Sequence, residues 1–285
     1  MMISREHVKK IFKEYTDRYD ASDGKIKLKI DHTYRVAEIC ERIAKSLALS
    51  AEDADLAWLL GMLHDVGRFE QLRRYGTFSD AQSIDHAHFG VELLYGNVDA
   101  SGFSGENRMD SAEKSKEMEK QKIFLEEFVN LSSGEEAYQV IKTAIWNHSA
   151  FRIEVGLDER MEMFCHILRD ADKVDIFKVC QDTPVEVIYN VTTEEVRHAG
   201  VTEEVMKQFF EKHAVLRSAK KTPVDHLVGH AALAFELVYP ESLKVAKEQG
   251  YLQKILAYPS ENEKTVEQLR ELREFLEEYL ENIEG

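Results

Sequence analysis

Proline and glycine are scarce in this chain of 285 residues. Only 4 prolines and 14 glycines occur, so long segments contain no residue that breaks a helix. Strand patterns are also scarce. Residues 185–193 are β-branched enough for a short extended piece, but no alternation of apolar and polar residues repeats over several segments. We therefore expect an all-α protein, and parallel-sheet folds with glycine-rich phosphate loops are disfavoured.

Signals for export, oxidation and membrane insertion are missing as well. The cysteines Cys40, Cys165 and Cys180 are odd in number and form no C-x-x-C pair, which indicates reduced thiols. The N-terminus has no apolar signal core. The notable apolar stretch at residues 56–63 is too short to span a bilayer. We expect a soluble, cytoplasmic protein that does not act at a membrane.

Basic residues are outnumbered by acidic ones. The chain has 37 Lys plus Arg against 53 Asp plus Glu, a formal net charge of −16. A net negative charge of this size repels the phosphate backbone of nucleic acid, so we expect no nucleic-acid partner. A small phosphorylated substrate is still allowed, because it responds mainly to the local charges of a pocket. The sequence also allows a homodimer.

Apolar residues recur at helical spacing along most of the chain. We predict a helix over residues 82–95, another over 159–180 and a charged amphipathic helix from Glu261 onward. Thr222 and the proline that follows it predict the start of a helix that runs to about residue 238. Residues 97–120 form the one polar stretch, which favours a disordered insertion or a lid.

Histidine and aspartate side chains lie on several of the predicted apolar helix faces. His32 shares a face with Val36 and Ile39, and His148 shares one with Ile141. Burying a carboxylate on such a face is costly unless it is paired or bound to a metal. A lone histidine there is more often a hydrogen-bonded core residue, so the interpretation rests on the whole set. We expect a metal site of nitrogen and oxygen ligands, with no thiolate as in structural zinc sites, from His32, His64, Asp65 and Asp172.

Three strings of residues resemble a known family. They are Ile30-Asp31-His32 at the expected start of a helix, Met62-Leu63-His64-Asp65-Val66-Gly67-Arg68, and Arg169-Asp170-Ala171-Asp172-Lys173-Val174-Asp175. Their H…HD…D order resembles the HD-domain metal-dependent phosphohydrolase superfamily, over residues 30–180. The resemblance implies a helical bundle with the four ligands named above. Asp170 and Asp175 compete with Asp172, which is chosen because the family ligand precedes a basic residue.

The sequence shows no internal repeat and no clean domain boundary. We expect a single helical domain over residues 1–285. Within it, an HD core covers about 25–180 and a C-terminal helical extension covers about 181–285. The extension contains no recognisable substrate-specificity motif, so the substrate stays open.

Two further matches imply a second metal ion. The segment 85–94 resembles the H-x-x-x-G helix of binuclear members and aligns His86 with a ligand, with His88 as the alternative. His148 resembles a later ligating histidine, and Asp65 would then bridge both ions. His86 and His148 could instead be hydrogen-bond donors of the active site. We expect one or two divalent ions of Fe, Mn, Mg, Co, Ni or Zn.

These residue types suit hydrolysis. A divalent ion lowers the pKa of bound water from 15.7 to about 7, and Asp65 can orient that water. Arg68 resembles the basic residue that follows the family's HD pair and can bind phosphate in a bidentate way. Arg73, Lys173 and His88 are further candidates for substrate contacts, although Lys173 could be a surface charge. We predict a hydrolase of a small phosphorylated metabolite or nucleotide, acting on a phosphomonoester or a phosphodiester.

Two other functions compete with this one. Some binuclear HD proteins are di-iron oxygenases, and the same six expected ligands would serve them. A non-catalytic signalling module that retains a structural metal is the other alternative. His226 and His230 are spaced to bind one ion together, but they lack the carboxylate motif of a zincin. The favoured interpretation of that pair is an ordinary helix surface, or a position that supports the ligands without binding the metal.

Overall fold

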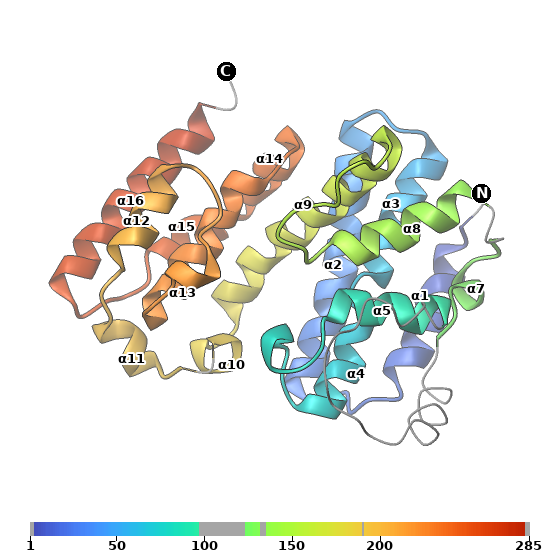
Figure 1. Ribbon diagram of the computed structural model, residues 1–285, viewed down its shortest axis with the longest axis horizontal. Helices are drawn as coiled ribbons and strands as arrows, with labels where there is room; N and C mark the ends of the chain where they lie inside the picture. The colour runs from blue at the N-terminus through green and yellow to red at the C-terminus, as the bar shows by residue number, and fades with distance from the viewer. Residues whose placement is uncertain (1–2, 97–122, 132–134, 190, 283–285) are drawn as a thin grey trace. The chain divides into compact units, whose positions relative to one another are not determined.

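The computed structural model describes residues 3–96, 123–131, 135–189 and 191–282, and every regular element in these ranges is a helix (Figure 1). The predicted all-α class is therefore confirmed. The chain divides into two compact units, residues 1–168 and 169–285, and the boundary falls inside one helix. The expected single domain stays a prediction. The expected polar insertion at 97–120 lies outside the described residues.

The first unit carries the helices that precede this boundary. Helices α2 and α3 pack along each other, α4 packs on α5, and α5 packs on α8 (Figure 1). The described helices of this unit are α1 (Arg5–Thr16), α2 (Gly24–Ser46), α3 (Ala51–Leu63), α4 (Val66–Tyr75), η1 (Asp80–Gln82), α5 (His86–Tyr95), α7 (Leu125–Phe128), α8 (Glu136–Asn147) and the first part of α9 (Glu159–Asp182).

The second unit holds the rest of α9 and shorter helices. Within it, α13 packs on α15, and α15 packs on α16 (Figure 1). Its described helices after α9 are α10 (Val185–Tyr189), α11 (Thr193–His198), α12 (Glu203–Phe210), η3 (Arg217–Ala219), α13 (Pro223–Ala231), η4 (Ala232–Glu236), α14 (Pro240–Gln249), α15 (Tyr251–Leu256) and α16 (Glu263–Glu281).

Two glycines allow the helices around His64 and Asp65 to pack closely in the first unit. A Cβ atom at Gly61 on α3 would lie 2.4 Å from the Cα atom of Ala37 on α2. A Cβ atom at Gly67 on α4 would lie 2.3 Å from the carbonyl oxygen of His86 on α5. Real Cβ atoms do not come this close to backbone atoms. The backbones of α2 and α3, and of α4 and α5, can therefore approach only because these residues are glycine.

Some predicted boundaries were wrong. Residues 185–189 are helical and not extended: α10 covers Val185–Tyr189, and a second helix, α11, begins at Thr193. The carbonyl of Pro184 accepts from the amides of residues 187 and 188, and Thr192 forms a capping box with Glu195. These turn-forming contacts override the β-branched composition of the segment.

Other helix starts and ends also differ from the prediction. The helix of His32 begins at Gly24, after an Asp23 N-cap, so His32 lies well inside α2. The helix expected from residue 82 begins only at His86. The helix that Thr222 caps ends at Ala231 and continues as the 3-10 helix η4. The C-terminal amphipathic helix and the helix over 159–180 are found as predicted.

Within the described part of the chain, none of the helices combines the length and the apolar character that crossing a membrane requires.

Candidate metal centre

His64 and Asp65 form the junction between two helices. Helix α3 ends with His64 as its C-cap residue, and Asp65 is the N-cap residue of α4. An aspartate at this position usually accepts a hydrogen bond from the first turn, but the Asp65 side chain makes no capping hydrogen bond. Both side chains are buried, with exposed fractions of 0% and 2%. The junction thus directs an imidazole and a carboxylate into the interior.

The carboxylate of Asp65 lies between two pairs of histidines. Its Oδ2 atom is 3.5 Å from Nε2 of His32 and 3.5 Å from Nε2 of His64. Its Oδ1 atom is 3.4 Å from Nε2 of His86 and 3.8 Å from Nε2 of His148. All four histidines are buried. Each oxygen therefore faces its own imidazole pair, which is the arrangement that a carboxylate shared by two cations requires.

Hydrogen bonds on the far side of the rings fix which nitrogen faces Asp65. Nδ1 of His64 lies 2.8 Å from the carbonyl oxygen of Gly61, and Nδ1 of His148 lies 2.7 Å from that of Ile145. A carbonyl only accepts, so both Nδ1 atoms donate. In the neutral ring Nε2 then carries a lone pair. This is the tautomer in which Nε2 ligates a metal.

His86 is oriented in the same way by a carboxylate. Its Nδ1 atom donates to Oδ2 of Asp80 at 2.8 Å, and its Nε2 atom lies 3.0 Å from Nε2 of His148. Burial, with the nearby Arg68 charge, lowers the pKa of His86 to about 3. The ring is therefore neutral near neutral pH, and two Nε2 lone pairs face each other at short range. A cation between them removes this repulsion, so the donor set fits a metal ion.

The Asp65 carboxylate is ionised. Burial alone would raise its pKa, but Lys29 and the His64 ring lower the pKa well below its ordinary value. An ionised carboxylate inside a protein requires a cationic partner. The residues of the first unit thus supply one negative charge and four imidazoles to a single buried site, a donor set that suits first-row transition metals.

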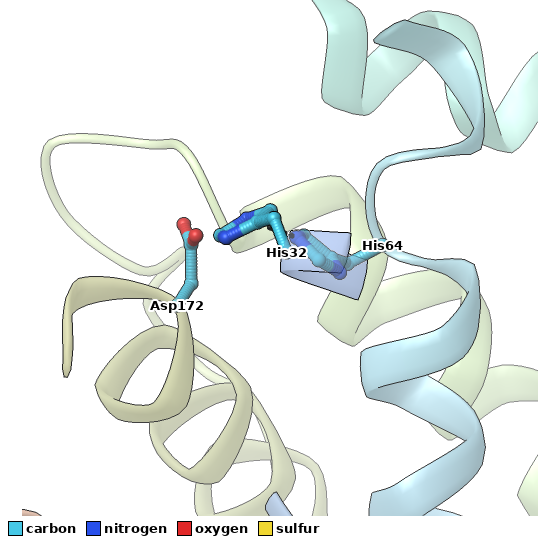
Figure 2. A group of neighbouring side chains, drawn as sticks. All are labelled: His32, His64 and Asp172. Atoms are coloured by element: carbon cyan, nitrogen blue, oxygen red, sulfur yellow. Dashed lines mark hydrogen bonds between the residues drawn. The ribbon is translucent and has the colours of Figure 1, made fainter. Parts of the chain in front are cut away.

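Two groups of side chains could each hold a metal ion. His64, Asp65 and His148 form one group, and His32, His64 and Asp172 form the other. In each group, one ligand atom per residue lies within 4.8 Å of the others. Figure 2 shows the second group, with the Asp172 carboxylate turned toward the imidazole of His32. Asp172 belongs to the same unbroken helix, α9, that begins in the first unit.

The competing carboxylate Asp170 has other partners. It accepts hydrogen bonds from the backbone amides of Val238 and Tyr239 at 2.9 Å and from the hydroxyl of Ser242 at 2.7 Å. Asp170 therefore caps the start of α14. Asp172, in contrast, belongs to one of the two groups that could hold a metal ion, and it is therefore the better ligand candidate.

Comparisons with known proteins identify the family of the chain. The family model of the HD domain matches residues 30–177, more than half of the chain. The chain belongs to the HD-domain family. Its helices form the all-α fold expected for an HD domain, with further helices after the core. His32, His64, Asp65 and Asp172 all lie within the matched range, and their assignment as ligands stays a prediction.

One curated relative is similar to part of this HD domain. The 3'3'-cGAMP-specific phosphodiesterase 1 of Vibrio cholerae serotype O1 is 24% identical over 102 residues, which cover 32% of this chain. The match spans 24% of that protein's length, about a quarter. No solved structure matches the chain.

Arg68 of the HD domain is fixed by several acceptors. Its Nη1 atom donates to Oε1 of Gln71 at 2.7 Å, to the carbonyl of Phe78 at 2.6 Å and to Oδ1 of Asp80 at 2.8 Å. Its buried Nε atom lies 3.6 Å from Oδ1 of Asp65 and has no hydrogen-bond partner among the described residues. Arg68 thus presents one N–H group beside the carboxylate, and its role in binding an anion stays a prediction.

The other predicted substrate contacts have different surroundings. Arg73 pairs with Glu70 on the same helix. His88 stacks on Trp146, with ring centroids 3.6 Å apart. Burial and the Arg169 charge lower the pKa of Lys173 to about 8. Their roles stay predictions.

The His226 and His230 pair has no place in either ligand group. The hydroxyl oxygen of Tyr189 lies 2.6 Å from Nδ1 of His230, within hydrogen-bond distance, and the Cys180 thiol lies 3.0 Å from the same atom. His226 stacks on the Tyr189 ring. A packed hydrogen-bonded cluster within the second unit accounts for both histidines.

Two residues of the site were missed by the sequence analysis. Lys29 places Nζ 2.7 Å from Oδ2 of Asp65, and Asp80 holds both His86 and Arg68. Lys29 precedes His32 by one helical turn on α2, a spacing that puts both side chains on one face. That spacing was a usable signal for Lys29. Asp80 gave no such signal, because its role depends on the fold of the α4–α5 connection.

Proposed function

We propose that this HD-domain protein is a metal-dependent phosphohydrolase that cleaves a phosphomonoester or a phosphodiester of a small metabolite or nucleotide. The observation that carries the proposal is the Asp65 carboxylate, whose two oxygens face the His32–His64 and His86–His148 pairs. Membership of the HD family and the phosphodiesterase named above support the reaction class.

The proposed ligands are the six residues predicted from the sequence. They would hold one or two divalent ions, with Asp65 shared between the histidine pairs. A divalent ion in such a site supplies hydroxide near neutral pH, because it lowers the pKa of bound water from 15.7 to about 7. The chain's own contribution is to orient the imidazoles of His64, His148 and His86, through Gly61, Ile145 and Asp80.

Arg68 would bind the phosphoryl group of the substrate. Its Nε–H group is buried, lies beside Asp65 and has no hydrogen-bond partner among the described residues. A buried donor of this kind is costly unless a ligand accepts from it. A phosphate oxygen is a suitable acceptor, and hydrogen bonds from arginine to phosphate are strong. Because Asp80 and Phe78 hold the guanidinium, the donor is already oriented.

A substrate panel tests the proposal. Metal-free protein is supplied with Mn, Mg, Co, Ni, Fe or Zn and offered phosphomonoesters, linear phosphodiesters and a cyclic dinucleotide. We expect metal-dependent release of phosphate or of a nucleotide product from at least one class. Chelator-treated protein and Asp65→Asn are the controls. If none of these esters is cleaved with any of these metals, the proposal is wrong.

An oxygenase would use the same ligands, so the assay must separate the two reactions. Protein purified without oxygen and loaded with iron is tested for substrate-dependent oxygen uptake. A phosphohydrolase consumes no oxygen and works with redox-inactive metals such as Mg or Zn. Oxygen uptake that depends on iron, with no hydrolysis by other metals, would support the oxygenase instead.

A further inference from the structure

Lys29 is a second cation at the Asp65 carboxylate. Its Nζ atom lies 2.7 Å from Oδ2 of Asp65, whereas Arg68 Nε lies 3.6 Å from Oδ1. Each oxygen of the carboxylate therefore has one basic side chain beside it as well as one histidine pair. The Lys29 side chain is 18% exposed, so it reaches both the buried carboxylate and the solvent.

The Phe78 ring lies near both basic groups. Nζ of Lys29 lies 5.5 Å from the centre of the Phe78 ring, and Cζ of Arg68 lies 5.9 Å from it. In the protein without a bound metal, the carboxylates of Asp65 and Asp80 balance these two charges. A divalent ion held at Asp65 would add positive charge beside them, and the site would then attract an anionic group although the net charge of the chain is −16.

The two cations differ in how firmly they are held. Three acceptors fix Nη1 of Arg68. Among the described residues, by contrast, Nζ of Lys29 donates a hydrogen bond to Asp65 alone. An ammonium group on a flexible four-carbon stem can turn to a new partner, whereas a guanidinium held at several points cannot. Lys29 is therefore the basic group that can follow an incoming anion.

We infer that Lys29 binds the phosphoryl group of the substrate, together with Arg68. This inference rests on the proposed function. Once Oδ2 of Asp65 has a divalent cation as partner, repulsion between like charges weakens the contact with Nζ. An oxygen of the substrate's phosphoryl group then balances the Lys29 charge. Lys29 thus pairs with Asp65 in the metal-free protein and with the substrate anion in the metal-loaded protein.

Calorimetric titration of inorganic phosphate into metal-loaded protein tests the inference without turnover. We expect Lys29→Met to weaken phosphate binding about 10- to 100-fold, the effect of one lost charge-assisted hydrogen bond. Lys29→Arg should recover part of the affinity. Lys27→Met is the matched control: Lys27 lies on the same helix, pairs with Asp31 and is 67% exposed, so its loss should leave phosphate binding unchanged.

Metal binding is measured on the same variants. Removing a competing positive charge should leave the metal affinity of Lys29→Met equal to or above that of the wild type. Unchanged phosphate affinity in a folded Lys29→Met protein would overturn the inference, as would a loss of metal. If Lys29→Met does not fold, Lys29→Gln takes its place in both titrations. Wild-type protein that binds metal but no phosphate would overturn it too.

The kinetic readout separates this inference from the proposed function. If a substrate is found, Lys29→Met should raise KM at least as much as it lowers kcat, since Lys29 contacts the anion and does not hold the metal. If no substrate is cleaved by the wild type, the proposed function fails while the phosphate titration still decides the role of Lys29.

Discussion

At the scale of single residues, Asp65 combines two properties that are hard to combine. It is buried and ionised, and it is surrounded by four imidazoles, of which those of His64, His86 and His148 are oriented by acceptors on their far sides. A carboxylate in such a place is stable only with cations around it. Lys29 and Arg68 provide positive charge within the protein, and the proposed metal ions would provide the rest.

The first prediction concerns Asp65 itself. Asp65→Asn should reduce both bound metal and hydrolysis by at least about 100-fold, because loss of even an outer partner of a metal ligand costs 10- to 100-fold. Metal content by mass spectrometry and turnover are measured together. Asp31→Asn is the control, since Asp31 is an exposed neighbour of His32 that pairs with Lys27. Equal metal content in wild type and Asp65→Asn would show that Asp65 is not a ligand.

The second prediction concerns the outer partner of His86. Asp80→Asn should weaken metal binding or activity about 10- to 100-fold, because an amide fixes neither the His86 tautomer nor the Arg68 guanidinium as a carboxylate does. Metal titration and turnover give the two values. The charge-conserving variant Asp80→Glu should lose less. An Asp80→Asn protein with wild-type metal affinity and wild-type turnover would show that this contact has no functional effect.

The residue scale also shows what sequence reasoning could reach. Histidines and aspartates on apolar faces pointed to a buried site, because such burial needs a cation. Lys29 was overlooked since a lysine near a helix start is usually a solvated charge. Asp80 could not be found, because its partners His86 and Arg68 meet it only after α4 and α5 have packed together.

At the scale of elements, the α3–α4 junction and the α4–α5 contact create the site. The junction directs His64 and Asp65 inward, and the contact at Gly67 brings His86 to them. The helices were predictable from apolar spacing. The start of α5 and the helical state of residues 185–189 were not, because caps and local turns decide them and those depend on single side chains.

The third prediction tests the α4–α5 contact. In Gly67→Ala the new Cβ atom would meet the His86 carbonyl oxygen at 2.3 Å, so the helices must separate. We expect a loss of about 1–3 kcal/mol in the free energy of unfolding, the usual cost of overpacking, together with weaker metal binding. Denaturant unfolding and metal titration measure both effects.

Gly24→Ala is the matched control for that substitution. Gly24 begins α2, and no atom lies within 4 Å of the position where a Cβ would stand. Alanine favours a helix over glycine by about 1 kcal/mol in helix interiors, so this variant should be as stable as the wild type or slightly more stable. A Gly67→Ala protein that behaves like Gly24→Ala would contradict the proposed role of the contact.

At the scale of the whole molecule, helix α9 carries one aspartate with a structural role and one that is an expected metal ligand. Asp170 caps α14 within the second unit, and Asp172 is the expected metal ligand on the same helix. The family match covers the HD core but ends at residue 177. The chain after this point was predicted only as helical, because its short helices carry no motif that the sequence analysis could connect with a substrate.

The fourth prediction separates the two aspartates of α9. Asp170→Ala should lower the free energy of unfolding by about 1–3 kcal/mol for each buried donor left without an acceptor, while the folded protein retains its metal. Asp172→Ala should have the opposite pattern, with weakened metal binding and a smaller change in stability. Denaturant unfolding and metal content are compared between the two variants. Metal loss in folded Asp170→Ala, with full metal content in Asp172→Ala, would reverse the assignment.

The central claim is that Asp65 is shared by cations held between the two histidine pairs. Anomalous diffraction from a crystal loaded with manganese or zinc measures this directly. The account predicts two anomalous peaks within about 2.3 Å of the Asp65 oxygens, one beside His32 and His64 and the other beside His86 and His148. A loaded crystal with no peak at Asp65, or with its metal bound elsewhere, would contradict it.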